Sequence, residues 1–144
     1  TGDWVLKRVG VVAAAFCRSI DHFGRLGGEE FAILLRGCSL RDAVRMAEDC
    51  RVRIGAIPSR ESGHNFPISA SFGVSVTALS GNDLDRLISH ADQALYRSKR
   101  EGRNRVRAYE RELPIELSSQ GVTVLRPEAS RREAAAAESG ASVA

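Results

Sequence analysis

A run of alternating residues between Phe66 and Thr77 places the strongest constraint on how this chain can fold. Apolar residues occupy the even positions, and mostly small or polar residues occupy the odd positions. Because successive side chains of a β-strand point to opposite faces, the alternation predicts a strand with one buried face. We expect Ser69, Ser71 and Ser75 to lie on its polar face.

Three segments with helical periodicity accompany this strand. Apolar residues recur every three or four positions over residues 3–18, 43–54 and 84–95, which predicts three helices that each have one apolar face. Ser39 is a suitable N-cap for the second helix, and Asp42, three residues further on, is suited to complete a capping box.

Two glycines followed by two acidic residues lie between short apolar segments at residues 22–26 and 31–36. The sequence at this point is Gly27-Gly28-Glu29-Glu30-Phe31, and the arrangement predicts a β-hairpin. Glycine lacks a Cβ atom, so a phosphate or a base can approach the backbone closely. Carboxylates suit Mg²⁺ bound beside nucleotide phosphates. The other interpretation is an ordinary solvated turn.

The order of these elements, followed by a short strand over residues 105–109, predicts an α/β sandwich in which helices pack on a sheet. Residues 121–125 are compatible with one stray strand. Residues 130–144 consist largely of Ala, Glu, Arg and Ser and are predicted to be disordered, because they offer little to a core. We therefore expect a domain over residues 1–109 and a mostly disordered tail over residues 110–144.

The net charge of +3 is unevenly divided along the chain. Residues 1–109 contain 17 basic and 12 acidic side chains, whereas residues 110–144 contain 4 and 6. A basic folded region favours an anionic ligand, such as a nucleotide or a nucleic acid.

Six basic side chains and one acidic side chain lie within residues 97–107. This run is compatible with a solvated helix end, with a nucleic-acid surface, or with Lys99 and Arg103 reaching over a triphosphate. No RNA-recognition or helix-turn-helix signature accompanies it, so no nucleic-acid partner is expected.

The three cysteines, Cys17, Cys38 and Cys50, form no CxxC pair. Their odd number and spacing favour buried thiols in a reducing, cytoplasmic setting over a disulfide or zinc framework. No stretch of the sequence is long and apolar enough to span a bilayer, and no membrane contact is expected of this segment.

An arginine and an aspartate three residues apart, Arg18 and Asp21, precede the glycine turn by five residues. A guanidinium and a carboxylate placed together are suited to grip a guanine edge or a phosphate. The other interpretation is a surface ion pair, which contributes little to stability.

Together these residues resemble the GGDEF family, the diguanylate cyclase domain, in its GGEEF variant. The resemblance runs from about residue 2 to residue 106. It is carried by the motifs Gly2-Asp3, Arg18-x-x-Asp21, Arg25-x-Gly27-Gly28-Glu29-Glu30-Phe31, Ser71-Phe72-Gly73-Val74 and Ala91-Asp92-x-Ala94-Leu95-Tyr96-x-x-Lys99-x-x-Gly102-Arg103-Asn104.

The resemblance implies a nucleotidyl-cyclase-like sheet with flanking helices and a homodimer that condenses two GTP molecules into cyclic di-GMP, releasing pyrophosphate. It assigns Glu29 and Glu30 to catalysis and to binding Mg²⁺ or Mn²⁺. It assigns GTP binding to Asp3, Gly27, Gly28, Lys99 and Arg103, and an inhibitory site for the product cyclic di-GMP to Arg18 and Asp21.

The sequence departs from the family's pattern at its N-terminal end. The family's domain opens with a central strand that carries a metal-binding Asp, and this strand would precede Thr1. We therefore expect the chain to be the C-terminal part of a longer protein, to have unpaired strand edges beside the hairpin, and to be inactive alone. The alternative function is a non-catalytic cyclic di-GMP receptor that uses Arg18 and Asp21.

Overall fold

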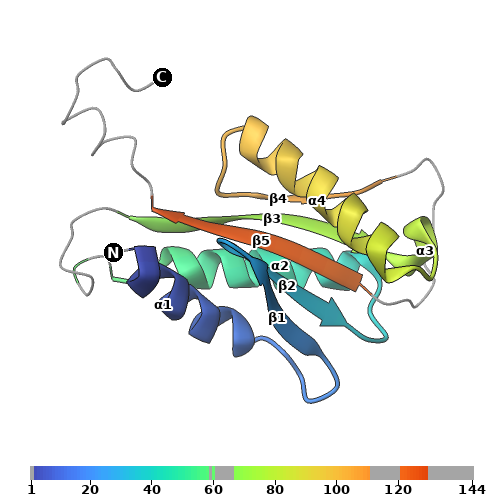
Figure 1. Ribbon diagram of the computed structural model, residues 1–144, viewed down its shortest axis with the longest axis horizontal. Helices are drawn as coiled ribbons and strands as arrows, with labels where there is room; N and C mark the ends of the chain where they lie inside the picture. Colours follow the sequence, from blue (N-terminus) through green and yellow to red (C-terminus); the bar gives the residue numbers. More distant parts are fainter. Residues whose placement is uncertain (1, 59, 61–66, 111–120, 130–144) are drawn as a thin grey trace.

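The structure is a computed structural model that describes residues 2–58, 60, 67–110 and 121–129. The described part is a five-stranded sheet in the order β1-β2-β5-β3-β4 with helices on both faces (Figure 1), which confirms the expected α/β class. The elements are α1 (Gly2–Ala14), β1 (His22–Gly27), β2 (Glu30–Leu35), α2 (Leu40–Gly55), β3 (Ile68–Val76), α3 (Thr77–Ser80), α4 (Leu84–Arg100), β4 (Val106–Ala108) and β5 (Gly121–Ala129).

The helices divide between the two faces of the sheet. α1 and α2 share one core cluster with β2 and β3, and α4 forms a second cluster on the opposite face. α2 begins where the sequence predicts, because the Ser39 hydroxyl accepts a hydrogen bond from the amide of Asp42 at 3.1 Å. α1 ends at Ala14, four residues early, because Phe16 and Cys17 donate to carbonyls only three residues back, which tightens the chain into turns.

The position of β5 differs most from the sequence-based expectation. The stray strand expected over residues 121–125 extends over 121–129 and lies at the centre of the sheet, antiparallel to both β2 and β3. β5 therefore covers the inner edges of β2 and β3, which were expected to be unpaired, and the outer strands of the described sheet are β1 and β4. The predicted domain, residues 1–109, leaves out β5, although β5 belongs to the same sheet. The remainder of the predicted tail, residues 111–120 and 130–144, lies outside the described residues.

The prediction that β3 has one buried face is wrong. All nine residues of β3 are buried, because α2 contacts one face and α4 the other. Two of the serines on the expected polar face form hydrogen bonds with protein partners. The Ser75 hydroxyl donates to the carbonyl of Leu87 on α4 at 2.6 Å, and the Ser71 hydroxyl donates to Glu128 of β5 at 2.7 Å. A buried polar group costs little when it is hydrogen-bonded, so serine is compatible with this interior face.

Gly73 allows α4 to approach β3 very closely. A Cβ atom at this position would lie 2.0 Å from the carbonyl oxygen of Ala91 and 2.3 Å from the amide nitrogen of Leu95. Both are backbone atoms of α4, so no rotamer change could relieve the clash. The Ser98 hydroxyl adds a hydrogen bond from α4 to the carbonyl of Phe72 at 2.6 Å. The small residues of β3 therefore fix where α4 lies and where its C-terminal end points.

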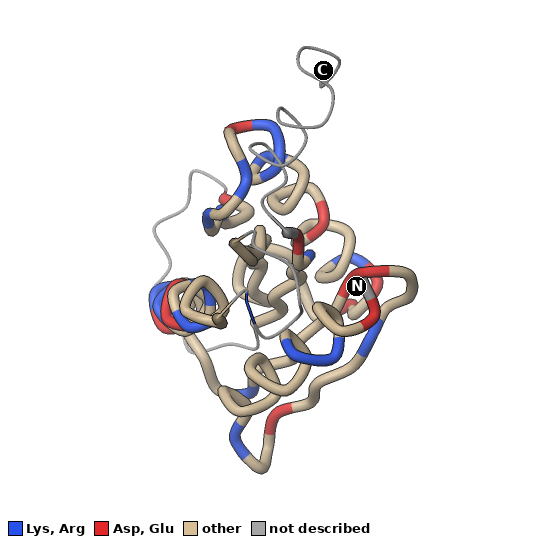
Figure 2. Tube along the Cα trace, turned by 90° about the vertical axis from the view of Figure 1, so that its left-hand side faces the viewer, with Lys and Arg blue, Asp and Glu red and all other residues tan. Residues whose placement is uncertain are grey.

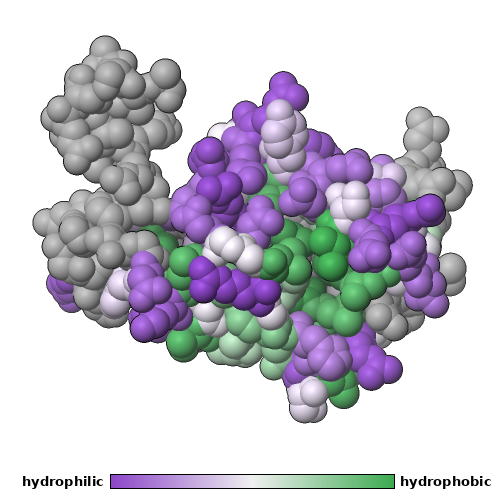
Figure 3. Space-filling model, viewed as in Figure 1, coloured by the Kyte–Doolittle hydropathy of each residue, from purple (hydrophilic) through white to green (hydrophobic). Residues whose placement is uncertain are grey.

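Within the described part of the chain, no helix combines the length and apolarity needed to cross a bilayer. Figure 3 shows polar residues over α4 at the top of the view and apolar surface across the middle. Cys38 and Cys50 are buried, Cys17 is partly buried, and none of the three forms a disulfide. Burial raises the pKa of the Cys50 thiol to about 12, which makes this thiol unreactive.

Replacing Gly73 by alanine should destabilise the protein by about 3 kcal/mol or prevent folding, because the new methyl group would overlap the α4 backbone. Urea unfolding followed by circular dichroism measures this loss. Gly24→Ala is the matched control, since Gly24 also lies in a strand and a Cβ there meets nothing within 4 Å. Equal stability of the two variants would show that α4 does not pack on Gly73.

Candidate functional site

The glycine turn forms the tip of the β1–β2 hairpin, as predicted. Gly27 and Gly28 have φ values of 134° and 54°, a region that residues with a Cβ atom rarely adopt. A Cβ on either glycine would meet no atom within 4 Å. The glycines are therefore needed for the backbone conformation, and they leave open space above the turn. The Arg25 guanidinium supports the turn from within by donating from Nε to the carbonyl of Gly28 at 2.9 Å.

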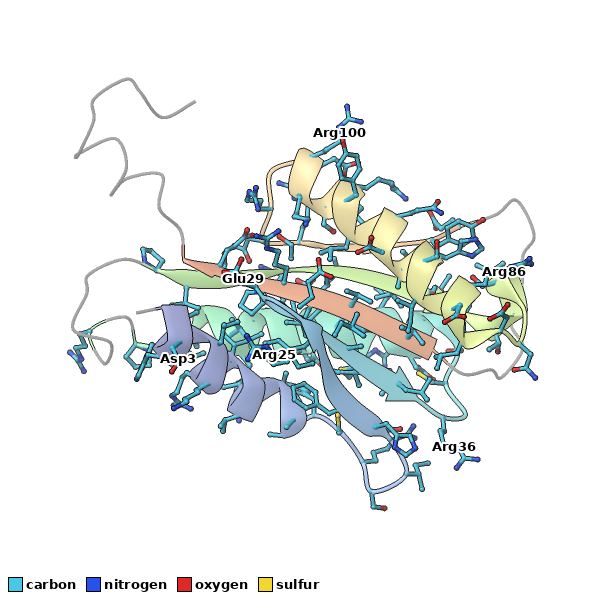
Figure 4. All side chains as sticks on the ribbon, in the orientation of Figure 1. Asp3, Arg25, Glu29, Arg36, Arg86 and Arg100 are labelled. Atoms are coloured by element: carbon cyan, nitrogen blue, oxygen red, sulfur yellow. The ribbon has the colours of Figure 1, made fainter. Side chains whose placement is uncertain are left out.

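The two turn carboxylates differ in their surroundings. Glu29 lies at the exposed tip and Glu30, the first residue of β2, is half-buried. Figure 4 shows Glu29 at the hairpin tip, beside β5. The register explains this proximity: Phe31 pairs with Leu125, so the next residue of β5, Arg126, lies level with the start of β2. Its guanidinium contacts the Glu29 carboxylate at 2.8 Å.

The second half of the site follows α4. Gly102, Arg103 and Asn104 all have positive φ, at 125°, 64° and 49°, and the amide of Arg103 bonds back to the carbonyl of Ser98 at 2.9 Å. A non-glycine residue in this region costs about 1 kcal/mol. The surrounding contacts thus hold Arg103 in a conformation that it would not adopt alone. In Figure 2 the basic run of residues 97–107 appears as the blue segments gathered at the top.

β5 connects the glycine turn to this basic loop. Arg126 and Glu128 lie two residues apart on β5, and therefore on the same face of the strand. This is the α4 face, which Val122 and Val124 share. The Glu128 carboxylate forms an ion pair with Arg103. One strand thus pairs with a predicted catalytic carboxylate through Arg126 and with a predicted phosphate-binding arginine through Glu128.

The residues present do not form a metal centre in this arrangement. No group of three or more His, Cys, Asp or Glu side chains in the described ranges is close enough to hold a metal ion. A guanidinium, rather than further carboxylates, lies beside Glu29. Divalent cations such as Mg²⁺ need several oxygen ligands, so Glu29 could join Glu30 in holding the metal that the resemblance implies only after it releases Arg126.

Arg18 and Asp21 form a tight internal pair. The Asp21 carboxylate is fully covered and accepts from the amide and guanidinium of Arg18 at 2.8 to 3.0 Å and from the amide of Arg36 at 3.2 Å. The hydrogen bonds from the Arg18 guanidinium hold the pKa of Asp21 below its usual value. The Arg18 side chain is 53% exposed. Asp21 therefore orients Arg18, and Arg18 is the member of the pair that a ligand can reach.

The remaining predicted residues are less closely grouped. Asp3 lies in the first turn of α1, is highly exposed, and pairs with Lys7 at 3.7 Å; Figure 4 shows it away from Glu29. Lys99 is half-buried in the last turn of α4, four residues before Arg103.

Sequence reasoning missed Arg126 and Glu128. Arg126 and Glu128 follow Val122 and Val124 at two-residue spacing, which places all four on one face of a strand, but both are charged, so the apolar alternation does not extend to them.

A family described as "Diguanylate cyclase, GGDEF domain" matches residues 1–105. The diguanylate cyclase DgcP of Pseudomonas aeruginosa is 40% identical over 106 residues, which cover 73% of this chain and 16% of the relative. The diguanylate cyclase DosC of Escherichia coli is 37% identical over 115 residues, with coverage of 78% and 25%. The response regulator PleD of Caulobacter vibrioides is 36% identical over 107 residues, with coverage of 73% and 24%.

A solved structure gives the same result for the fold. The active GGEEF domain of a diguanylate cyclase from Vibrio cholerae superposes with a TM-score of 0.68 at 33% identity, covering 76% of this chain and 69% of that chain. The chain spans a quarter or less of the length of the three curated relatives named above.

Replacing Asp21 by asparagine should reduce the free energy of unfolding by about 2 kcal/mol or more, because a covered carboxylate with several donors loses its charge. The folded pKa of Asp21 is depressed, so its contribution is present above the unfolded pKa of about 3.9 and is lost as the pH falls through the folded value. Urea unfolding of both proteins should therefore show a constant difference between pH 7 and 5 that shrinks below pH 4. A difference independent of pH down to pH 2 would contradict this role.

Proposed function

The chain belongs to the GGDEF family of diguanylate cyclases, and we propose that it acts as the domain that condenses two GTP molecules into cyclic di-GMP with release of pyrophosphate. The observation that carries this proposal is the family match over residues 1–105 in a chain that keeps both acids of the turn together with Lys99 and Arg103. A domain that had lost the reaction would have no need to keep all four.

In the proposed reaction each copy of a homodimer presents one GTP. The 3′-oxygen of each nucleotide forms a bond to the α-phosphorus of the other, the bond from each α-phosphorus to its pyrophosphate breaks, and the two 3′-hydroxyl protons pass to the turn carboxylates. We assign Gly27 and Gly28 to contact with the nucleotide, because the turn keeps open space above its backbone. Lys99 and Arg103 supply positive charge to the phosphates, where negative charge develops during the transfer.

We assign Glu29 and Glu30 as the ligands of a divalent cation, Mg²⁺ or Mn²⁺, in the active form. Such a cation would neutralise charge on the phosphates and lower the pKa of a bound oxygen. The contact of Arg126 with Glu29 must then be exchanged for the cation. Asp3 is assigned to the guanine edge through its exposed carboxylate.

We assign Arg18 as the contact for the product cyclic di-GMP and Asp21 as the residue that positions it. The half-exposed guanidinium above a covered carboxylate supports this division of roles. The same pair would serve the alternative function, a receptor that binds cyclic di-GMP without making it. The two functions differ in their need for the turn carboxylates.

Replacing Glu30 by glutamine should lower cyclic di-GMP synthesis by at least about 100-fold while leaving the fold intact, because a charge is lost with almost no change in volume. Synthesis is measured by chromatography of the products formed from GTP and Mg²⁺. Asp49→Asn, on the exposed side of α2, is the matched control and should retain activity. Turnover by the Glu30 variant at the rate of the unmodified protein would refute the assigned role. No synthesis by any variant, with cyclic di-GMP binding retained, would favour the receptor.

A further inference from the structure

We propose that β5 is an autoinhibitory strand whose Arg126 and Glu128 occupy the two charged halves of the nucleotide site. Arg126 presents a cation to Glu29, in place of the metal ion, and Glu128 presents a carboxylate to Arg103, in place of a phosphate. This inference rests on the proposed function, because it takes Glu29 and Arg103 to be the groups that bind the metal and the nucleotide.

The register of the sheet brings β5 to the site. Residues 121–125 of β5 pair with both neighbouring strands, β2 and β3. Residues 126–129 pair with β3 alone, because β2 begins at Glu30 and its ladder with β5 stops at Phe31. The last part of β5 therefore runs past the glycine turn and lies in the space between that turn and the loop after α4.

The contacts of this last part of β5 include a mostly buried carboxylate that has several hydrogen-bond partners. The side chain of Glu128 is only 15% exposed, and besides Arg103 it accepts a hydrogen bond from the hydroxyl of Ser71 at 2.7 Å. The same hydroxyl accepts from the amide of Asn104 at 3.2 Å. A carboxylate that is mostly removed from water needs such partners. Glu128 thus lies within a network that includes the backbone of the basic loop.

The two charges of β5 are complementary to the charges of the site, as autoinhibition requires. The cation of β5 lies beside the acidic turn and its anion beside the basic loop, so each half of the site contacts the charge opposite to its own. A metal ion must compete with Arg126 for Glu29, and nucleotide phosphates must compete with Glu128 for Arg103. Because residues 126–129 pair on one side only, they can separate from the site while residues 121–125 remain in the sheet.

The test is the affinity of the full 144-residue chain for 3′-deoxy-GTP in the presence of Mg²⁺, measured by calorimetry. This nucleotide lacks the attacking hydroxyl and so cannot be turned over. Arg126→Gln/Glu128→Gln removes both charges without changing the net charge, and the glutamine oxygen at position 128 can still accept from Ser71. We expect the double variant to bind at least tenfold more tightly than the unmodified chain. Arg45→Gln/Asp49→Asn, which removes an equivalent pair of charges from the exposed side of α2, should leave the affinity unchanged.

Equal affinity of the double variant and the unmodified chain would overturn the inference and leave the proposed function standing. If no folded variant binds the nucleotide, the proposed function fails. In that case a titration with Mn²⁺ tests the inference separately. Paramagnetic broadening of the Gly28 and Glu29 amide signals should then occur at Mn²⁺ concentrations at least tenfold lower in Arg126→Gln than in the unmodified chain. Broadening at the same concentrations in both proteins would overturn the competition at Glu29.

Discussion

The pairing of β5 between β2 and β3 is the interaction on which the rest of the structure depends. Among the described strands, the β1–β2 hairpin and the β3–β4 pair meet only through β5. Val122 and Val124 pack against α4, whereas Leu125 joins the core formed with α1 and α2. One strand therefore links both helical layers as well as both halves of the sheet. The position of the glycine turn relative to the end of α4 is a consequence of this pairing.

The two ends of β5 have different chemical roles. Its first half is mostly apolar, buried and paired on both sides, so it supplies the stability of the sheet's centre. Its second half carries Arg126 and Glu128 and pairs on one side only. Because stability and site occupation reside in different halves, the charged half can change its contacts without loss of the sheet. Gly73 and Ser75 of β3, together with Ser98 of α4, fix α4, and hence Arg103, against the same sheet.

Much of the local structure could be predicted from the sequence. Periodicity identified the helices and β3, the capping pattern at Ser39 located the start of α2, and the glycine–acid pattern identified the hairpin turn. Each of these signals depends on residues close together in the chain. The family's assignment of roles to Glu29, Glu30, Lys99 and Arg103 rests on motifs of the same local kind.

The remainder depended on contacts between distant residues. A period of two predicts a strand but not its neighbours, so residues 121–125 could be recognised as a strand but not placed between β2 and β3. The burial of the serines in β3 follows from the packing of α4, which no pattern within the strand reveals. The ion pairs of Arg126 and Glu128 follow from the register of β5, and a shift by one residue would move both side chains to the other face.

Amide hydrogen exchange along β5, followed residue by residue by NMR, tests the central claim most directly. A strand paired on both sides should exchange only through extensive unfolding, so the amides of residues 122–125 are expected among the slowest in the protein. The amides of Arg126 and Glu128, where the strand pairs on one side, should exchange faster. Rapid exchange throughout residues 122–125, at the rate of an exposed loop, would contradict the claim that β5 holds the sheet together.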